Sequence, residues 1–208
     1  MQGHESLCRV SPGKETIRLM PADLFLVRHA SPDWNRTDLR YDIPPGPPLT
    51  DQGRSEARSL GEFLAQQNIQ CILASPMDRA HETAAVASAI VQTPVVITEG
   101  ITEWERGEPE SAVLERMLRH LTEAAALAAS GKAVALVTHG GPIRLLLSHF
   151  GVANAEIDFY RRQFDRDNPL PPAGAWRLTR SATNGGWEAS LAFSPVEFQV
   201  FTSSPTIV

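Results

Sequence analysis

The sequence predicts an α/β protein, a three-layer α/β/α sandwich with a mostly parallel central sheet, helices on both faces and a C-terminal hairpin. Three short apolar runs, each ending at a polar residue, are typical of buried parallel strands; they span residues 24–28, 71–74 and 133–138. Helical patterns alternate with these runs, and most connections are long enough for crossovers. Such sheets bind ligands at the edge where their parallel strands end.

The remaining elements follow from periodicity and from helix start and stop signals. Thr50 or Asp51 can cap a helix whose apolar stripe contains Ala57, Leu60, Gly61 and Leu64. Further expected elements are a helix over 78–90, a strand over 95–98, helices over 110–130 and 142–150, and a hairpin of strands 175–179 and 187–193 joined through 184–186. Gly131 and Gly151 are expected to end the last two helices, and the Pro-rich segment 42–48 to form an ordered loop near the ligand site.

Composition favours a single globular domain over residues 23–208, preceded by a flexible extension over 1–22. The chain has 208 residues, 42% hydrophobic and 21% charged, and no apolar run approaches the length of about 20 residues that a membrane helix needs. A net charge of −5 without a basic cluster argues against nucleic acid as a partner. Cys8 and Cys71 make a structural disulfide unexpected, which favours the reducing cytoplasm.

Histidines and arginines follow the predicted strands. His29 and His139 each end an apolar run, Arg28 precedes His29, and Arg79 comes shortly after the strand at 71–74. Two imidazoles and two guanidinium groups at one sheet edge would form a cationic cup suited to a phosphoryl group, because guanidinium matches phosphate oxygens bidentately. One imidazole could then act as a nucleophile.

Several short motifs follow one another over roughly residues 24 to 193. They are Arg28-His29-Ala30, Trp34-Asn35, Pro48-Leu49-Thr50-Asp51-Gln52-Gly53, Ser75-Pro76 through Ala84, Glu103 through Gly107, and His139-Gly140-Gly141 followed by Ile143-Arg144. With these motifs in this order, the chain resembles the histidine phosphatase superfamily, also called the phosphoglycerate mutase-like family. Arg28-His29-Ala30 is similar to the Arg-His-Gly signature of that family, although Ala30 replaces the glycine.

The resemblance implies a role for each site residue. His29 would be the nucleophile, with its second ring nitrogen held by a backbone carbonyl, and Glu103 the general acid and then the general base, with Glu105 as the alternative. Arg28, Arg79 and a protonated His139 would bind the phosphoryl oxygens and stabilise their charge during catalysis. Asn35 and Gly140 would make further contacts with the substrate. His81 and His120 are expected on helix surfaces.

The resulting hypothesis is a metal-independent phosphomonoester hydrolase of the histidine acid type, working through phosphohistidine at His29 on a small phosphorylated metabolite. A phosphoglycerate mutase-type phosphotransferase and a noncatalytic phosphate-binding module are the alternatives. No cofactor is expected, and the arginines beside the histidines would repel a metal ion. Arg116, Arg119 and Lys132 offer few cations for a second anionic group between 107 and 132, which favours the phosphatase. The physiological substrate and the oligomeric state stay open.

Overall fold

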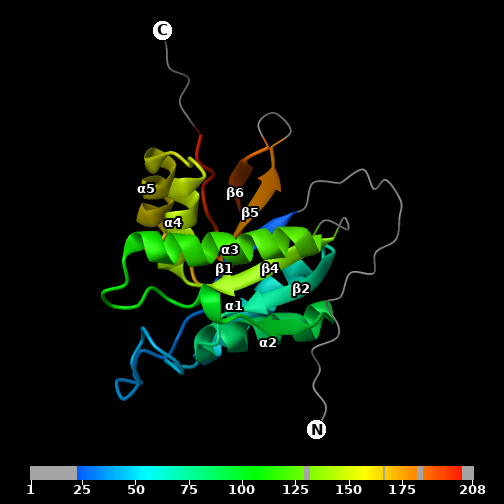
Figure 1. The fold of residues 1–208 in the computed structure, drawn as a ribbon. Helices are drawn as coiled ribbons and strands as arrows, with labels where there is room; N and C mark the ends of the chain where they lie inside the picture. Colours follow the sequence, from blue (N-terminus) through cyan, green and yellow to red (C-terminus); the bar gives the residue numbers. More distant parts are fainter. Residues whose placement is uncertain (1–22, 129–131, 166, 182–184, 203–208) are drawn as a thin grey trace.

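In the computed structural model, a six-stranded sheet lies between two layers of helices (Figure 1). The structure describes residues 23–128, 132–165, 167–181 and 185–202. The expected N-terminal extension lies outside these ranges, and so do Cys8, Gly131 and Asn184. In the described part of the chain, no helix is long and apolar enough to cross a membrane. The predicted three-layer α/β/α fold is confirmed.

The sheet is parallel over four strands and antiparallel over the last two. Its strands are β1 (Leu24–Arg28), β2 (Ile69–Ala74), β3 (Val95–Ile97), β4 (Ala133–Thr138), β5 (Ala175–Arg180) and β6 (Trp187–Phe193). Their order across the sheet is β3-β2-β4-β1-β5-β6, and β5 and β6 form the predicted antiparallel hairpin at one edge. Because β2, β4 and β1 are parallel neighbours, their carboxyl ends meet at one edge.

The helices divide between the two faces of the sheet. Their bounds are α1 (Asp51–Leu64), α2 (Asp78–Val91), α3 (Glu110–Ala128), α4 (Gly140–His149) and α5 (Asn154–Gln163), with a 3₁₀ turn, η1 (Glu99–Ile101). Figure 1 shows α1 and α2 below the sheet and α3, α4 and α5 above it. Successive side chains of a strand point to opposite faces, so Leu24 and Leu26 pack with the α3–α5 layer while Phe25 and Val27 pack with α1 and α2.

The beginning of α1 is fixed against the chain that follows β1. Thr50 is the N-cap: its Oγ1 accepts the N–H of Gly53 at 2.9 Å and donates to the carbonyl of Ser31 at 3.2 Å. A Cβ on Gly53 would lie 2.3 Å from that carbonyl oxygen, so only glycine permits this approach. The predicted stripe of α1 is buried as expected. This contact ties α1 to the segment just after His29.

Two helices differ from the sequence prediction. Helix α4 begins at Gly140, two residues before Pro142, because a proline is tolerated throughout the first turn, where its missing N–H leaves no helical bond unmade. Gly151, with φ of +82°, follows its end as predicted. Helix α5 was not predicted. It buries only Ile157 and Tyr160, too few positions for a clear apolar stripe.

Helix α3 matches its predicted bounds up to Ala128, where the description of the helix ends. Its buried face is centred one residue away from the predicted stripe, so that Val113 and Ala124 are buried while Leu114, Leu118 and Ala125 are partly buried. Cys71 is buried in β2, and the expectation that no disulfide forms stays a prediction because Cys8 is not described.

We predict that Thr50→Ala lowers the free energy of unfolding by about 1 kcal/mol, because the N–H of Gly53 loses its acceptor. Thr50→Ser, which keeps the hydroxyl, is the matched control and should lose much less. Urea unfolding followed by circular dichroism measures both. An equal loss in the two variants would attribute the effect to the threonine methyl group rather than to the cap.

Candidate active site

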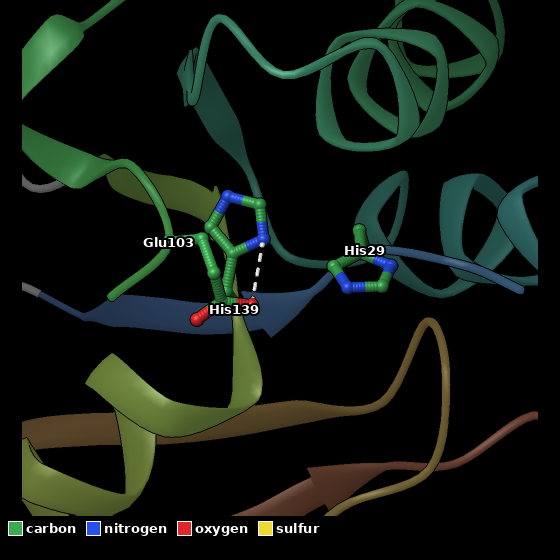
Figure 2. Close-up of side chains that lie close together, drawn as sticks. All are labelled: His29, Glu103 and His139. Carbon is green, nitrogen blue, oxygen red and sulfur yellow. Dashed lines mark ion pairs between the residues drawn. The ribbon is translucent and has the colours of Figure 1, made fainter. Parts of the chain in front are cut away.

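Three neighbouring parallel strands deliver polar side chains to one edge of the sheet. His29 follows β1, His139 follows β4, and Ser75 follows β2. The backbone continues the sheet pairing at these positions, since His29 N–H donates to Thr138 and Ser75 N–H donates to Val137. The rings of His29 and His139 lie 5.2 Å apart between centroids, and Figure 2 shows Glu103 reaching toward His139 from a separate loop. The side chains of His29, His139, Ser75 and Glu103 are all buried.

The tautomer of His29 follows from its contacts. Its Nδ1 lies 2.7 Å from the carbonyl oxygen of Ala30, which can only accept, so Nδ1 carries the proton. Nε2 therefore holds the lone pair and accepts from the hydroxyl of Tyr41 at 3.1 Å. Burial, and after it the charges of Arg79 and Arg28, hold the pKa of His29 well below its usual value. The ring is thus neutral, with a nucleophilic Nε2.

Ala30 fits where the resembling proteins carry glycine. Its φ is not among the positive values of the described residues, so the methyl group imposes no left-handed strain. The N–H of Ala30 donates to Thr83 Oγ1 at 2.9 Å, and that hydroxyl donates to the carbonyl of Arg79 at 2.6 Å. The backbone beside His29 is therefore bound to the first turn of α2, which carries Arg79.

The sequence predicts a positively charged His139 that donates to phosphoryl oxygens. Burial first, and then the charge of Arg79, hold its pKa well below the usual value, so these surroundings favour the neutral ring. Its Nδ1 accepts from Arg79 Nη2 at 3.1 Å, which leaves the proton on Nε2, where it donates to Ser75 Oγ at 2.9 Å. Sequence reasoning did not assign this role to Ser75.

The two arginines hold unused donors inside the protein. Arg79 is fully buried; its Nη2 lies 3.5 Å from Glu103 Oε2, and its guanidinium carbon lies 3.7 Å above the ring of Tyr41. Arg28 donates to the carbonyl of Leu170 at 3.0 Å and pairs with Asp165 at 2.9 Å. Nε of both residues and Nη1 of Arg79 have no hydrogen-bond partner among the described residues. Buried donors of this kind are costly unless a ligand accepts from them.

Glu103 lies at the site, and Glu105 does not. Glu103 is 9% exposed, and burial raises the pKa of its carboxyl, although the Trp104 N–H and the charge of Arg79 act in the opposite direction. Its Oε2 lies 3.5 Å from His139 Nδ1, the contact drawn in Figure 2. Glu105 is exposed. The loop is held by Arg116, which donates to the carbonyls of Gly100, Thr102 and Glu103 and pairs with Glu108.

Gly140 and Asn35 differ in their relation to the site. Gly140 is buried at the first turn of α4 and lines the site cavity, and a Cβ there would lie 1.6 Å from Asn168 Oδ1, so a larger residue would require the Asn168 side chain to move. Asn35 is exposed, its backbone N–H donates to Asp33 and its carbonyl accepts from Thr37, and it is not among the residues lining the cavity. The structure therefore brings every predicted site residue together except Asn35. His81 is exposed and His120 half-buried.

One nitrogen or oxygen from each of His29, Glu103 and His139 lies within 4.8 Å of the others, a spacing that a metal ion could use. Arg79 already occupies the neighbourhood of two of these side chains, with Nη2 at 3.1 Å from His139 and 3.5 Å from Glu103. A divalent ion there would meet a buried guanidinium at close range. The donor set is therefore suited to an anion rather than to a metal cation.

A cavity of about 550 Å³ opens beside these residues. It is lined by Arg28, Trp34, Tyr41, Glu103, Gly140, Gly141, Arg144, Arg161, Asp165, Asp167 and Asn168. Tyr41 directly precedes the Pro-rich segment 42–48, which is predicted to lie near the ligand site. The contributions of Arg161 and Asp165 carried no sequence signal, because their place at the site depends on how α5 and the following segment fold back over it.

Comparison with known proteins identifies the family. The model of the histidine phosphatase superfamily (branch 1) matches residues 24–111 and 103–168. An uncharacterized phosphatase of Bacillus subtilis is 28% identical over 160 residues, 65% of this chain and 81% of that protein. Phosphoserine phosphatase 1 of Hydrogenobacter thermophilus is 28% identical over 100 residues, 48% of this chain, and the match spans only 47% of the relative.

Solved structures share the fold. A mycobacterial glucosyl-3-phosphoglycerate phosphatase in complex with VO3 superposes with a TM-score of 0.64 at 17% identity, covering 83% of this chain and 99% of the other. The protein YhfR of Bacillus stearothermophilus gives a TM-score of 0.63 at 21% identity, covering 81% and 95%. With the family model matched across the strands and loops that build the site, the chain belongs to branch 1 of the histidine phosphatase superfamily.

Proposed function

We propose that the protein is a metal-independent phosphomonoesterase of the histidine acid type that works through a phosphohistidine on His29. The observation that carries this proposal is the pairing of a neutral His29, whose Nε2 holds a lone pair, with buried Arg28 and Arg79, whose guanidinium groups keep unpartnered N–H donors. A phosphoryl group would provide a partner both for the lone pair of His29 and for the free N–H donors of the arginines. Its phosphorus is the electrophile, and its oxygens accept the free donors.

The reaction would proceed in two balanced steps. In the first, the bond from His29 Nε2 to phosphorus forms as the ester P–O bond breaks, and Glu103 gives its proton to the leaving oxygen. In the second, water attacks phosphorus, Glu103 takes the proton of that water, and the N–P bond breaks to release phosphate. Burial suits Glu103 to this role because its raised pKa favours the protonated form with which the cycle begins.

Arg28, Arg79 and the first turn of α4 would hold the phosphoryl oxygens. The guanidinium groups neutralise charge that spreads over these oxygens in the transition state. The N–H groups at the start of α4, which include that of Gly140, have no acceptor within the helix and favour an anion. His139 anchors Arg79 through Nδ1, and a bound dianion would favour protonation of this ring.

Tyr41 must move as the substrate binds. Its hydroxyl donates to the lone pair of His29 Nε2, and the same lone pair has to attack phosphorus. Its ring covers Arg79 and stacks on Trp34, which is 65% exposed. Entry of a phosphoryl group therefore replaces one hydrogen bond of the tyrosine with the stronger contacts of a dianion to two guanidinium groups.

A small phosphorylated metabolite is the proposed substrate. The cavity has the volume typical of small-molecule sites. The substrates named for the similar proteins, phosphoserine and glucosyl-3-phosphoglycerate, are also small phosphomonoesters. We place this activity in the cytoplasm on the basis of the sparse cysteine content of the chain.

We predict that His29→Ala abolishes turnover and removes an acid-labile, base-stable phosphoenzyme, because no other described nucleophile replaces Nε2. The phosphoenzyme is measured by quenching the protein with a radiolabelled phosphomonoester and comparing its stability in acid and base. His81→Ala, on the exposed surface of α2, is the matched control and should keep both properties. Turnover by His29→Ala with a trapped phosphoserine would reject the assignment.

We predict that Glu103→Gln slows hydrolysis of an alkyl phosphate by about 10²- to 10⁴-fold, because an alkoxide needs the proton that the amide does not give. Phosphoryl transfer from p-nitrophenyl phosphate, whose leaving group is a weak base, should slow much less. Stopped-flow release of nitrophenol should then show a burst followed by a slow steady state. Glu105→Gln is the control and should retain both rates; equal slowing of both transfers by Glu103→Gln would remove it from the acid role.

The raised pKa of Glu103 gives a second expectation for the unmodified protein. A general acid works in its protonated form, so hydrolysis of the alkyl phosphate should fall as the pH rises through the pKa of Glu103. That decline should lie at higher pH than for an ordinary carboxyl group. The pre-steady-state release of nitrophenol from p-nitrophenyl phosphate should not show this decline. Pre-steady-state rates measured for both substrates over a pH series test the expectation. A decline shared by both substrates would assign it to another group.

We predict that exhaustive dialysis against EDTA leaves the activity unchanged and that vanadate inhibits competitively. Vanadate adopts the trigonal-bipyramidal geometry of phosphoryl transfer and would use the same arginines. Steady-state assays before and after chelation measure the first expectation, and inhibition at several substrate concentrations measures the second. Activity lost in EDTA and restored by zinc or magnesium would mean that His29, Glu103 and His139 hold an ion.

A further inference from the structure

The site cavity extends well beyond the space that a phosphoryl group would occupy. Arg28 and Glu103 line its catalytic end, and Arg144 lines it from α4. Arg144 lies four residues after Gly140 and three after Gly141 on this helix, so the three residues share one side of it. The rise of a helix places the backbone of Arg144 about 6 Å along the axis from Gly140. Arg144 therefore lines the same cavity as Gly140, about one helical turn further along α4.

Arg144 differs from the other arginines of similar exposure. In the part of the chain that the structure describes, the half-buried arginines are Arg54, Arg116, Arg144 and Arg161. Three of them pair with carboxylates: Arg54 with Asp51 and Glu82, Arg116 with Glu108, and Arg161 with Asp158. Arg144 has no hydrogen-bond or ion-pair partner among the described residues. A half-buried cation without a counter-charge is an attractive place for an anion.

The nearby acidic groups are engaged elsewhere or more exposed. Asp165 pairs with Arg28 and accepts from the side chain of Asn168. Glu103 lies against Arg79 and His139. Asp167 is exposed at the rim of the cavity. Among the described charged residues that line the cavity, Arg144 is thus the half-buried one without a partner of opposite charge.

We propose that Arg144 binds a second anionic group of the substrate, so that the enzyme prefers short phosphomonoesters carrying a carboxylate or another acidic group near the ester. This inference rests on the proposed phosphomonoesterase activity and adds the substrate class. It also revises the expectation that cations for a second anion are sparse, because Arg144 lies on α4, outside the segment between 107 and 132 where they were sought. Arg116, which lies within that segment, is used to hold the Glu103 loop.

The test compares four substrates that differ in the group beyond the ester. O-phospholactate carries a carboxylate, 1,3-propanediol bisphosphate a second phosphate, propyl phosphate no charge, and phosphoethanolamine a cation. We expect kcat/KM for the two acidic esters to exceed that for propyl phosphate by about tenfold to 100-fold, the contribution of one charge-assisted hydrogen bond. The acidic ester with the higher kcat/KM shows whether Arg144 prefers a carboxylate or a phosphate.

Arg144→Gln should remove most of this preference by raising KM for the acidic esters, with a far smaller change for propyl phosphate. Arg144→Lys should restore part of the preference, since lysine keeps the charge but lacks the two parallel N–H donors of a guanidinium group. Arg162→Gln, exposed on α5 and outside the cavity lining, is the matched control and should leave all four values unchanged. Turnover of propyl phosphate by each variant also reports that it has folded.

Two results would overturn the proposal. Equal kcat/KM for the acidic and neutral esters in the unmodified enzyme would mean that the cavity does not bind a second anionic group. A parallel loss for all four esters in Arg144→Gln would mean that the arginine supports the fold rather than binding the substrate. Failure of the proposed function is distinct from both, because the unmodified protein would then hydrolyse none of the esters.

Discussion

The site depends on the burial of one guanidinium group, that of Arg79. A charge removed from water is costly unless other groups replace its hydration. Arg79 obtains this compensation from the neutral nitrogen of His139, the carboxyl of Glu103 and the ring face of Tyr41. These residues come from β4, from the loop after η1 and from the segment before α1. The position of Arg79 therefore requires three distant parts of the chain to fold correctly, and each of these parts contacts its guanidinium group.

The same burial sets the protonation states. The cations of Arg79 and Arg28 disfavour a third positive charge nearby and add to desolvation in lowering the pKa of both histidines. A histidine kept neutral retains its nucleophilic lone pair at acidic pH. Desolvation has the opposite effect on Glu103, whose charged form is negative, and raises its pKa. The same buried, cationic environment thus favours a neutral His29 and the protonated form of Glu103, the two forms with which the proposed reaction begins.

Sequence reasoning could predict the parts of this site that belong to strand ends. His29 and His139 follow apolar runs whose parallel arrangement is forced by burial on both faces, and Arg79 and Glu103 sit in recognisable motifs. It could not predict the protonation of His139, because the partner of each ring nitrogen depends on side chains from other elements. It also grouped Asn35 with the site, whereas in the structure Asn35 is exposed and its backbone N–H donates to the local acceptor Asp33. Helix α5, with few buried positions, gave no usable pattern.

In the proposed enzyme, catalysis and selectivity would be carried by different parts of the fold. His29 and His139 follow strand ends, where the backbone is fixed by the sheet and a displacement would break ladder hydrogen bonds. The outer cavity is built from α4, from α5 and from the segment that holds Trp34 and Tyr41. Because α4 begins directly after His139, it fixes the backbone of Arg144 relative to the proposed phosphoryl site. In the proposed enzyme, a second charge on the substrate would therefore be recognised at a set distance from the reacting atom, whereas Tyr41, on a segment without regular structure, would have to move when that substrate binds.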